Sequence, residues 1–185
     1  SMQFFHTAFL LFRVVGAGIS VVVAQQLGFG NPLAAETVSR TALQASLITG
    51  SLAACVLAFG SEPLLVQFQV PAEVSIQAKP LMQWLSPCVL MDAVVVAMAS
   101  VMRAHLFAVQ SLRIMMLMHL THWLLAWLFM RNGLGLSGFA IAFILSRMLS
   151  LWLFTRAWES LLGIQGIWLT RPSLDRLACL SILRI

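Results

Sequence analysis

Charged residues are scarce in this 185-residue sequence, in which Asp, Glu, Lys and Arg together make up only 9%. Ordinary soluble domains carry about 25% charged residues. Here 61% of the residues are hydrophobic and the mean hydropathy is +0.95. A soluble fold could not remove that much apolar surface from water. The composition therefore excludes an ordinary soluble domain and indicates that lipid is the solvent.

Cysteines are also few, and the sequence holds only Cys55, Cys88 and Cys179. They lie in or beside apolar segments and show no paired spacing. Disulfide frameworks and metal sites are recognised by such spacing. We therefore interpret the three cysteines as packing residues rather than as part of a disulfide or a metal site.

Motifs of enzymes and of nucleotide-driven pumps are absent from the sequence. It contains no phosphate-binding loop and no HExxH, GxSxG or GxGxxG pattern. The glycine-rich residues 133–138 join two apolar segments and follow no strand, so they predict a tight turn with close helix packing. We therefore expect no catalytic residue, no cofactor and no enzymatic activity.

Basic residues are scattered singly, although the net charge is +5. Without a Lys/Arg run they predict no nucleic-acid binding, and beside apolar spans they are signals of membrane topology. If the spans alternate, one side receives seven of them: Arg40, Arg103, Arg113, Arg156, Arg171, Arg176 and Arg184. Arg13, Lys79 and Arg131 fall on or near the other side. This bias predicts that residues 28–40, residues 103–113 and the C-terminal tail face the cytoplasm.

What the chain has in quantity is long apolar runs. A bilayer core about 30 Å thick needs roughly 20 apolar residues per helix. Five segments fit this length, at about residues 7–27, 41–59, 81–102, 112–130 and 136–155. Residues 63–80 are too few and too polar to span, and an interfacial helix is predicted there. We expect an all-α, polytopic transmembrane helical bundle of about five spans, followed by the start of a sixth.

A ladder of small residues runs along the second predicted span. Its members are four residues apart: Ala42, Ser46, Gly50, Ala54 and Ala58. This spacing places them on one helical stripe, where small side chains let a neighbouring backbone approach closely. Because lipid gives no hydrophobic drive for helix association, we expect the packing of the bundle to concentrate on this stripe.

Two charged residues lie at membrane depth, where they are costly. Asp92, near the middle of its span, is the only acid so placed, and Arg147 lies inside the last span. Asp92 is either a polar clasp to a basic group on a neighbouring helix or a proton or cation site that lines a cavity. Arg147 needs a counter-charge, so we expect it to pair with Asp92.

Two histidines, His119 and His122, are three residues apart on the fourth predicted span and therefore share a helical face. Facing a cavity, they could carry protons or contact a cationic substrate. The alternative is that both are buried and hydrogen-bond to neighbouring helices. They have too few partners for a metal site. Asp92, His119, His122 and Arg147 are thus the candidates for a substrate or ion pathway, and we expect them to face the interior of the bundle.

Several segments resemble the multidrug and toxic compound extrusion (MATE) transporters. Residues 18–31, a helix rich in small residues that ends in Gln-Leu-Gly-Phe-Gly-Asn, are similar to the end of the second helix of that family. The other similar segments follow in the family's order: residues 63–65, 73–74 and 78 before the fourth helix, 100–104 at its cytoplasmic end, 132–142 at the entry to the sixth helix, and Ser146-Arg147 within it.

This resemblance implies a function and a domain organisation. The family couples inward flow of H⁺ or Na⁺ to export of drugs and organic cations across the inner membrane, using two six-helix lobes. It implies that residues 1–160 are most of an N-terminal lobe without its first helix. Residues 161–185 would be a cytoplasmic linker between lobes and the start of the next helix. A C-terminal lobe or a second copy would then be needed for transport.

Two rival functions remain open. A flippase of lipid-linked oligosaccharides shares the helical plan, but its cavity should carry several basic residues to hold phosphate, and Arg147 is the main deep candidate here. A non-transporting membrane subunit, or a truncated inactive product, would use its polar residues only as clasps between helices.

Overall fold

The computed structural model describes the backbone of residues 2–163 and the side chains of residues 14–163. Six helices follow one another: α1 (Met2–Gly28), α2 (Pro32–Phe59), α3 (Ser61–Gln67), α4 (Ala72–Ala104), α5 (Ala108–Arg131) and α6 (Gly135–Ala157). A π-helical turn at Trp158–Leu162 continues α6. Residues 2–163 contain no strand, and the prediction of an all-α bundle is confirmed. The predicted linker lies almost wholly outside the described residues.

Four helical segments are long and apolar enough to cross a membrane: Pro32–Phe59, Ala72–Ala104, Ala108–Arg131 and Gly135–Leu162. They contain the second to fifth predicted spans. The first predicted span, residues 7–27, lies within α1, whose described side chains form the shorter apolar segment Val14–Gly28. Every predicted span is therefore helical in the structure.

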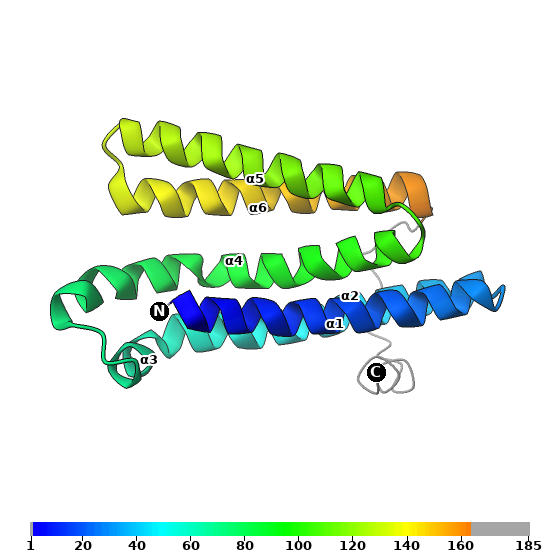
Figure 1. Ribbon diagram of the computed structural model, residues 1–185, viewed down its shortest axis with the longest axis horizontal. Helices are drawn as coiled ribbons and strands as arrows, with labels where there is room; N and C mark the ends of the chain where they lie inside the picture. Colours follow the sequence, from blue (N-terminus) through cyan, green and yellow to red (C-terminus); the bar gives the residue numbers. More distant parts are fainter. Residues whose placement is uncertain (1, 164–185) are drawn as a thin grey trace.

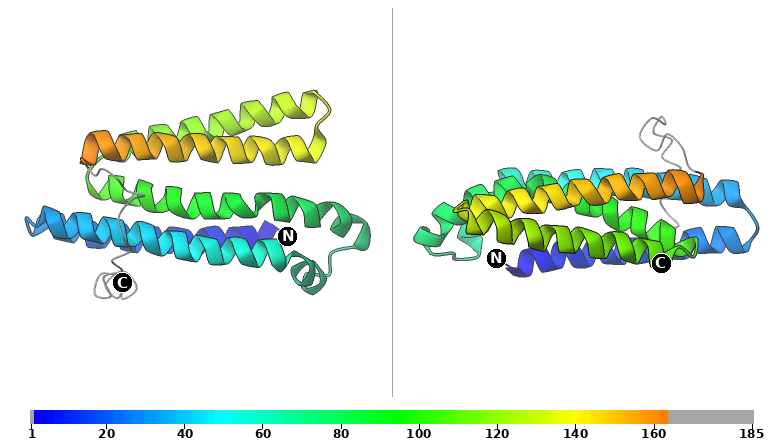
Figure 2. Two further views of the ribbon diagram at one scale, coloured as in Figure 1. Left: turned by 180° about the vertical axis from the view of Figure 1, so that it is seen from behind. Right: turned by 90° about the horizontal axis from the view of Figure 1, so that it is seen from above.

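Helix α4 occupies the centre of the bundle (Figure 1). Helices α1 and α2 pack together on one side of it, and the α5–α6 hairpin lies on the other, as the views of Figure 2 confirm. The α1–α2 turn, the α4–α5 turn and the end of α6 lie at one end of the bundle. Arg103, Arg113 and Arg156 therefore share that end, as the topology argument requires. Which end faces the cytoplasm stays a prediction.

The prediction of one interfacial helix over residues 63–80 is wrong. The short helix α3 covers only its start, and α4 begins at Ala72, so Pro80 lies inside a long helix. Pro87 also lies in α4 and removes the N–H that the carbonyl of Gln83 would otherwise accept. The hydroxyl of Ser86 donates to that carbonyl at 2.8 Å. Such local hydrogen bonds allow proline within a membrane helix.

The predicted small-residue stripe does hold two helices together. Ala42, Ser46 and Gly50 are buried, and α2 and α4 form an extensive contact. A Cβ placed on Gly50 would lie only 2.9 Å from the Cβ of Ala93 in α4. The end of the stripe is half-buried, so close approach is concentrated at its beginning and middle.

The structure also tests two further predictions, one for the glycine-rich turn and one for the cysteines. Gly133 and Gly135 have φ of +81° and +51°, and a Cβ on Gly138 would lie 2.8 Å from that of Phe129, as expected for a tight turn with close packing. Cys88 is buried among apolar residues, in agreement with a packing role. Cys55 is exposed, so the packing prediction is wrong for it. Cys179 lies outside the described residues.

Candidate functional site

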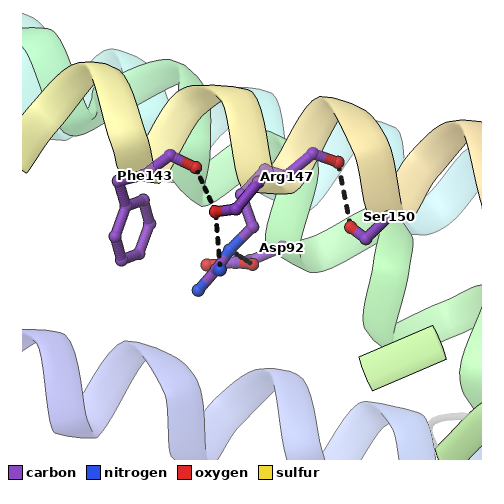
Figure 3. A network of polar contacts seen from close by, with 5 residues as sticks. Asp92, Phe143, Arg147 and Ser150 are labelled. Carbon is purple, nitrogen blue, oxygen red and sulfur yellow. Dashed lines mark hydrogen bonds and ion pairs between the residues drawn. The ribbon is translucent and has the colours of Figure 1, made fainter. Parts of the chain in front are cut away.

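An ion pair joins α4 to α6 in the interior of the bundle. The Nε atom of Arg147 donates to Oδ1 of Asp92 at 2.6 Å, and both side chains are less than a tenth exposed. Figure 3 shows Arg147 extending from α6 to meet the carboxylate of Asp92. The predicted pairing is therefore present, and it links the central helix α4 to its neighbour α6.

The hydroxyl of Ser146 and the ring of Phe143, both from α6, lie beside the guanidinium of Arg147. Its Cζ atom lies 4.0 Å from the centre of the Phe143 ring, a cation–π contact. Its Nη1 atom is 3.5 Å from the hydroxyl of Ser146, and Ser150 donates to the Arg147 carbonyl at 2.9 Å. Positions 143, 146, 147 and 150 share one face of a helix. Phe143 and Ser150 were not singled out from the sequence, and Ser146 appeared there only in the family resemblance, because their contacts depend on the orientation of Arg147.

A cavity of about 730 Å³ lies beside the ion pair. Four helices contribute to its wall, which combines a few polar groups with apolar side chains. The lining residues are Ala17 and Ser20 from α1; Asp92, Val95, Val96, Ala99 and Arg103 from α4; Met115, Met118 and His119 from α5; and Arg147 from α6. Cavities of this size and composition accommodate small organic molecules.

The two histidines occupy different environments. His119 lines the cavity together with Asp92 and Arg147 and is exposed, so the alternative of a buried, hydrogen-bonded residue is wrong for it. His122 is half-buried and packs against α6, with its ring centre 5.2 Å from that of Phe139 and 5.1 Å from that of Phe143. Although they share a helical face, only His119 reaches the cavity.

Arg103 is a cavity residue that the sequence argument treated only as a topology signal. It lies eleven residues after Asp92 in α4, which is about three helical turns and therefore the same face. This spacing is the feature of the sequence from which the position of Arg103 on the cavity could have been predicted.

Among the described side chains, no three of His, Cys, Asp and Glu lie close enough to hold a metal ion.

Comparison with known proteins gives one family match. The MatE family model matches residues 1–128, about two thirds of the chain. The matched part covers α1 to α4 and most of α5, and so contains Asp92, Arg103 and His119 but not Arg147. Neither the curated proteins nor the solved structures gave a match to the chain.

Proposed function

The chain belongs to the MatE family of multi-pass membrane transporters, and we propose that it is a secondary active antiporter of the inner membrane. In this proposal, inward flow of H⁺ or Na⁺ drives the export of drugs and organic cations. The resemblance of residues 18–31 and 132–142 to that family supports the proposal, as do the four helices able to span a membrane. The described helices would form one lobe of the transporter.

The observation that carries the proposal is the position of the Asp92–Arg147 pair on the wall of the cavity. Ionisable groups inside a membrane are expensive and are typical of ion and substrate paths. Asp92 accepts from Arg147, which stands on a different helix. A proton or Na⁺ at the carboxylate would compete with Arg147 and weaken the link between α4 and α6. Ion binding could in this way be coupled to a rearrangement of the cavity.

Export in an efflux-deficient bacterial host that makes this chain together with the further lobe of the proposed transporter tests this coupling. We expect Asp92→Asn to abolish the uncoupler-sensitive or Na⁺-dependent export of ethidium, since the amide cannot take up a proton. The matched control is Glu62→Gln, which removes the exposed partner of Lys79 in an ion pair of the same length, 2.6 Å. Export that persists in Asp92→Asn at wild-type expression would contradict the proposal and favour a purely structural clasp.

A flippase of lipid-linked oligosaccharides is the second candidate, and one observation favours it. Two arginines, Arg103 and Arg147, line the cavity, whereas the sequence had offered one deep candidate. Flipping of a fluorescent lipid-linked sugar in proteoliposomes, without export of ethidium, would select this alternative.

A further inference from the structure

Arg103 extends into the cavity rather than toward the end of its helix. Its Nη2 atom donates to the hydroxyl of Ser100 at 2.7 Å, which lies three residues earlier in α4. Ser100 is fully buried and donates in turn to the carbonyl of Val96 at 2.7 Å. The guanidinium is therefore drawn back along α4 toward the middle of the bundle, on the cavity side.

A basic residue at the end of a membrane helix ordinarily turns outward to the interface. Arg113, near the start of α5 at the same end of the bundle, is exposed and is not among the residues that line the cavity. Arg103 is exposed as well, but it lines the cavity, and its one hydrogen bond among the described residues points back along α4 toward the middle of the bundle. An interfacial topology signal alone does not explain this orientation.

The charge of Arg103 is not neutralised by the protein in the described region. Within residues 14–163, no Asp or Glu carboxylate forms an ion pair with it. The cavity's acidic group, Asp92, is already paired with Arg147. Among the described residues, Arg103 is thus the positive charge on the cavity wall with which no carboxylate forms an ion pair. Apolar wall residues, among them Val96, Ala99 and Met115, lie between and beside these charged groups.

We propose that Arg103 binds an anionic group, a carboxylate or a phosphate, of an amphipathic compound whose apolar body lies along the cavity. A guanidinium carries five N–H donors in a planar fork that suits such oxyanions. The bond to Ser100 fixes the side chain and uses only one of these donors. The proposal rests on the proposed function only in taking the cavity as the substrate path. It assigns a further specificity: among compounds with one apolar body, those with an acidic group bind more tightly.

Two dyes with one ring system test this specificity. Rhodamine 110 carries a free carboxylate, and rhodamine 123 is its methyl ester, so their binding differs at the acidic group. We expect the full-length protein in neutral phosphatidylcholine nanodiscs to bind rhodamine 110 about tenfold more tightly than rhodamine 123, by fluorescence polarisation. Arg103→Gln should bring the ratio close to one while leaving rhodamine 123 binding intact, which also reports correct folding.

Two further variants separate charge from geometry. Arg103→Lys retains the charge but loses the planar fork, so we expect an intermediate ratio. Arg113→Gln removes a positive charge at the same end of the bundle and should leave the ratio unchanged. A ratio near one in the wild type, or a preference that Arg103→Gln leaves intact, would overturn the proposal. If Arg103→Gln does not fold, Arg103→Lys decides, since an unchanged ratio there would contradict recognition by the fork.

A lipid headgroup is the other source of such an anion. Repeating the titration with phosphatidylglycerol in the nanodisc distinguishes the two sources. A tenfold preference in both membranes identifies a soluble anionic compound as the ligand. Loss of the preference only with the anionic lipid, in the wild type, identifies the lipid phosphate as the group at Arg103. Because this assay measures binding without export, its failure is distinct from a failure of the coupling test on Asp92.

Discussion

Arg147 shows how a charge is accommodated inside the bundle. Its guanidinium contacts a carboxylate on α4, a serine hydroxyl and the face of Phe143, and it is 5% exposed. A buried ion pair gains little net stability, because desolvation opposes the attraction of the charges. Removing one partner is different, because the other charge is then left without compensation. The pair is thus stable when intact and sensitive to any ion that competes at Asp92.

A double-mutant cycle measures this dependence. We expect Asp92→Asn and Arg147→Met each to lower the free energy of unfolding by about 3 kcal/mol, since each leaves an uncompensated charge. The double variant should lose less than the sum, with a coupling of about 1–3 kcal/mol. Thermal unfolding of the purified protein in detergent gives these values. Losses that simply add would show that the two residues act independently, despite their 2.6 Å contact.

Residues of the site could be predicted from the sequence where only one partner of opposite charge was available. Asp92 is the sole deep acid, so its partner followed from the sequence. The difference between His119 and His122 could not be predicted, because it depends on where Phe139 and Phe143 of α6 lie. Arg103 was missed because a basic residue at the end of a span is ordinarily interpreted as a signal of membrane topology. Only the hydrogen bond to Ser100 shows that its side chain turns inward.

Helix α4 determines most of the architecture. It packs against each of the other helices described, and one of its faces carries Asp92, Val96, Ala99 and Arg103 along the cavity. Lengths of the apolar runs predicted the long helices well, because the bilayer sets them. The start of α4 was not predicted, since Pro80 suggested a boundary. The neighbouring helices hold α4 in place, and the hydroxyl of Ser86 donates to the Gln83 carbonyl that Pro87 leaves without a backbone N–H.

The close contact of α2 with α4 provides a test at the level of helices. We expect Gly50→Val to destabilise the protein by about 1–3 kcal/mol, because its side chain would overlap Ala93 and Leu90. Ser51→Val, on the exposed side of the same turn, is the matched control and should have little effect. Thermal unfolding in detergent compares the two variants. Equal stability of both would show that the small-residue stripe does not limit the approach of the helices.

At the scale of the described molecule, α1, α4, α5 and α6 line one cavity. Secondary transporters alternate access by moving one repeat against another around a site between them. The described residues form a single set of helices around one cavity wall, with no second set facing it. We therefore infer that the cavity needs a further lobe, or a second copy of this chain, to close over a substrate.

Expression of the 185-residue chain on its own tests that inference. We expect it to insert into the membrane, because α2 and α4 pack closely through Ala42, Ser46 and Gly50, but not to confer efflux. Ethidium accumulation in an efflux-deficient host, at confirmed membrane levels, is the measurement. The Asp92→Asn variant should then accumulate as much dye as the unaltered chain. Lower accumulation that an uncoupler reverses and that Asp92→Asn abolishes would instead show that two copies assemble into a working transporter.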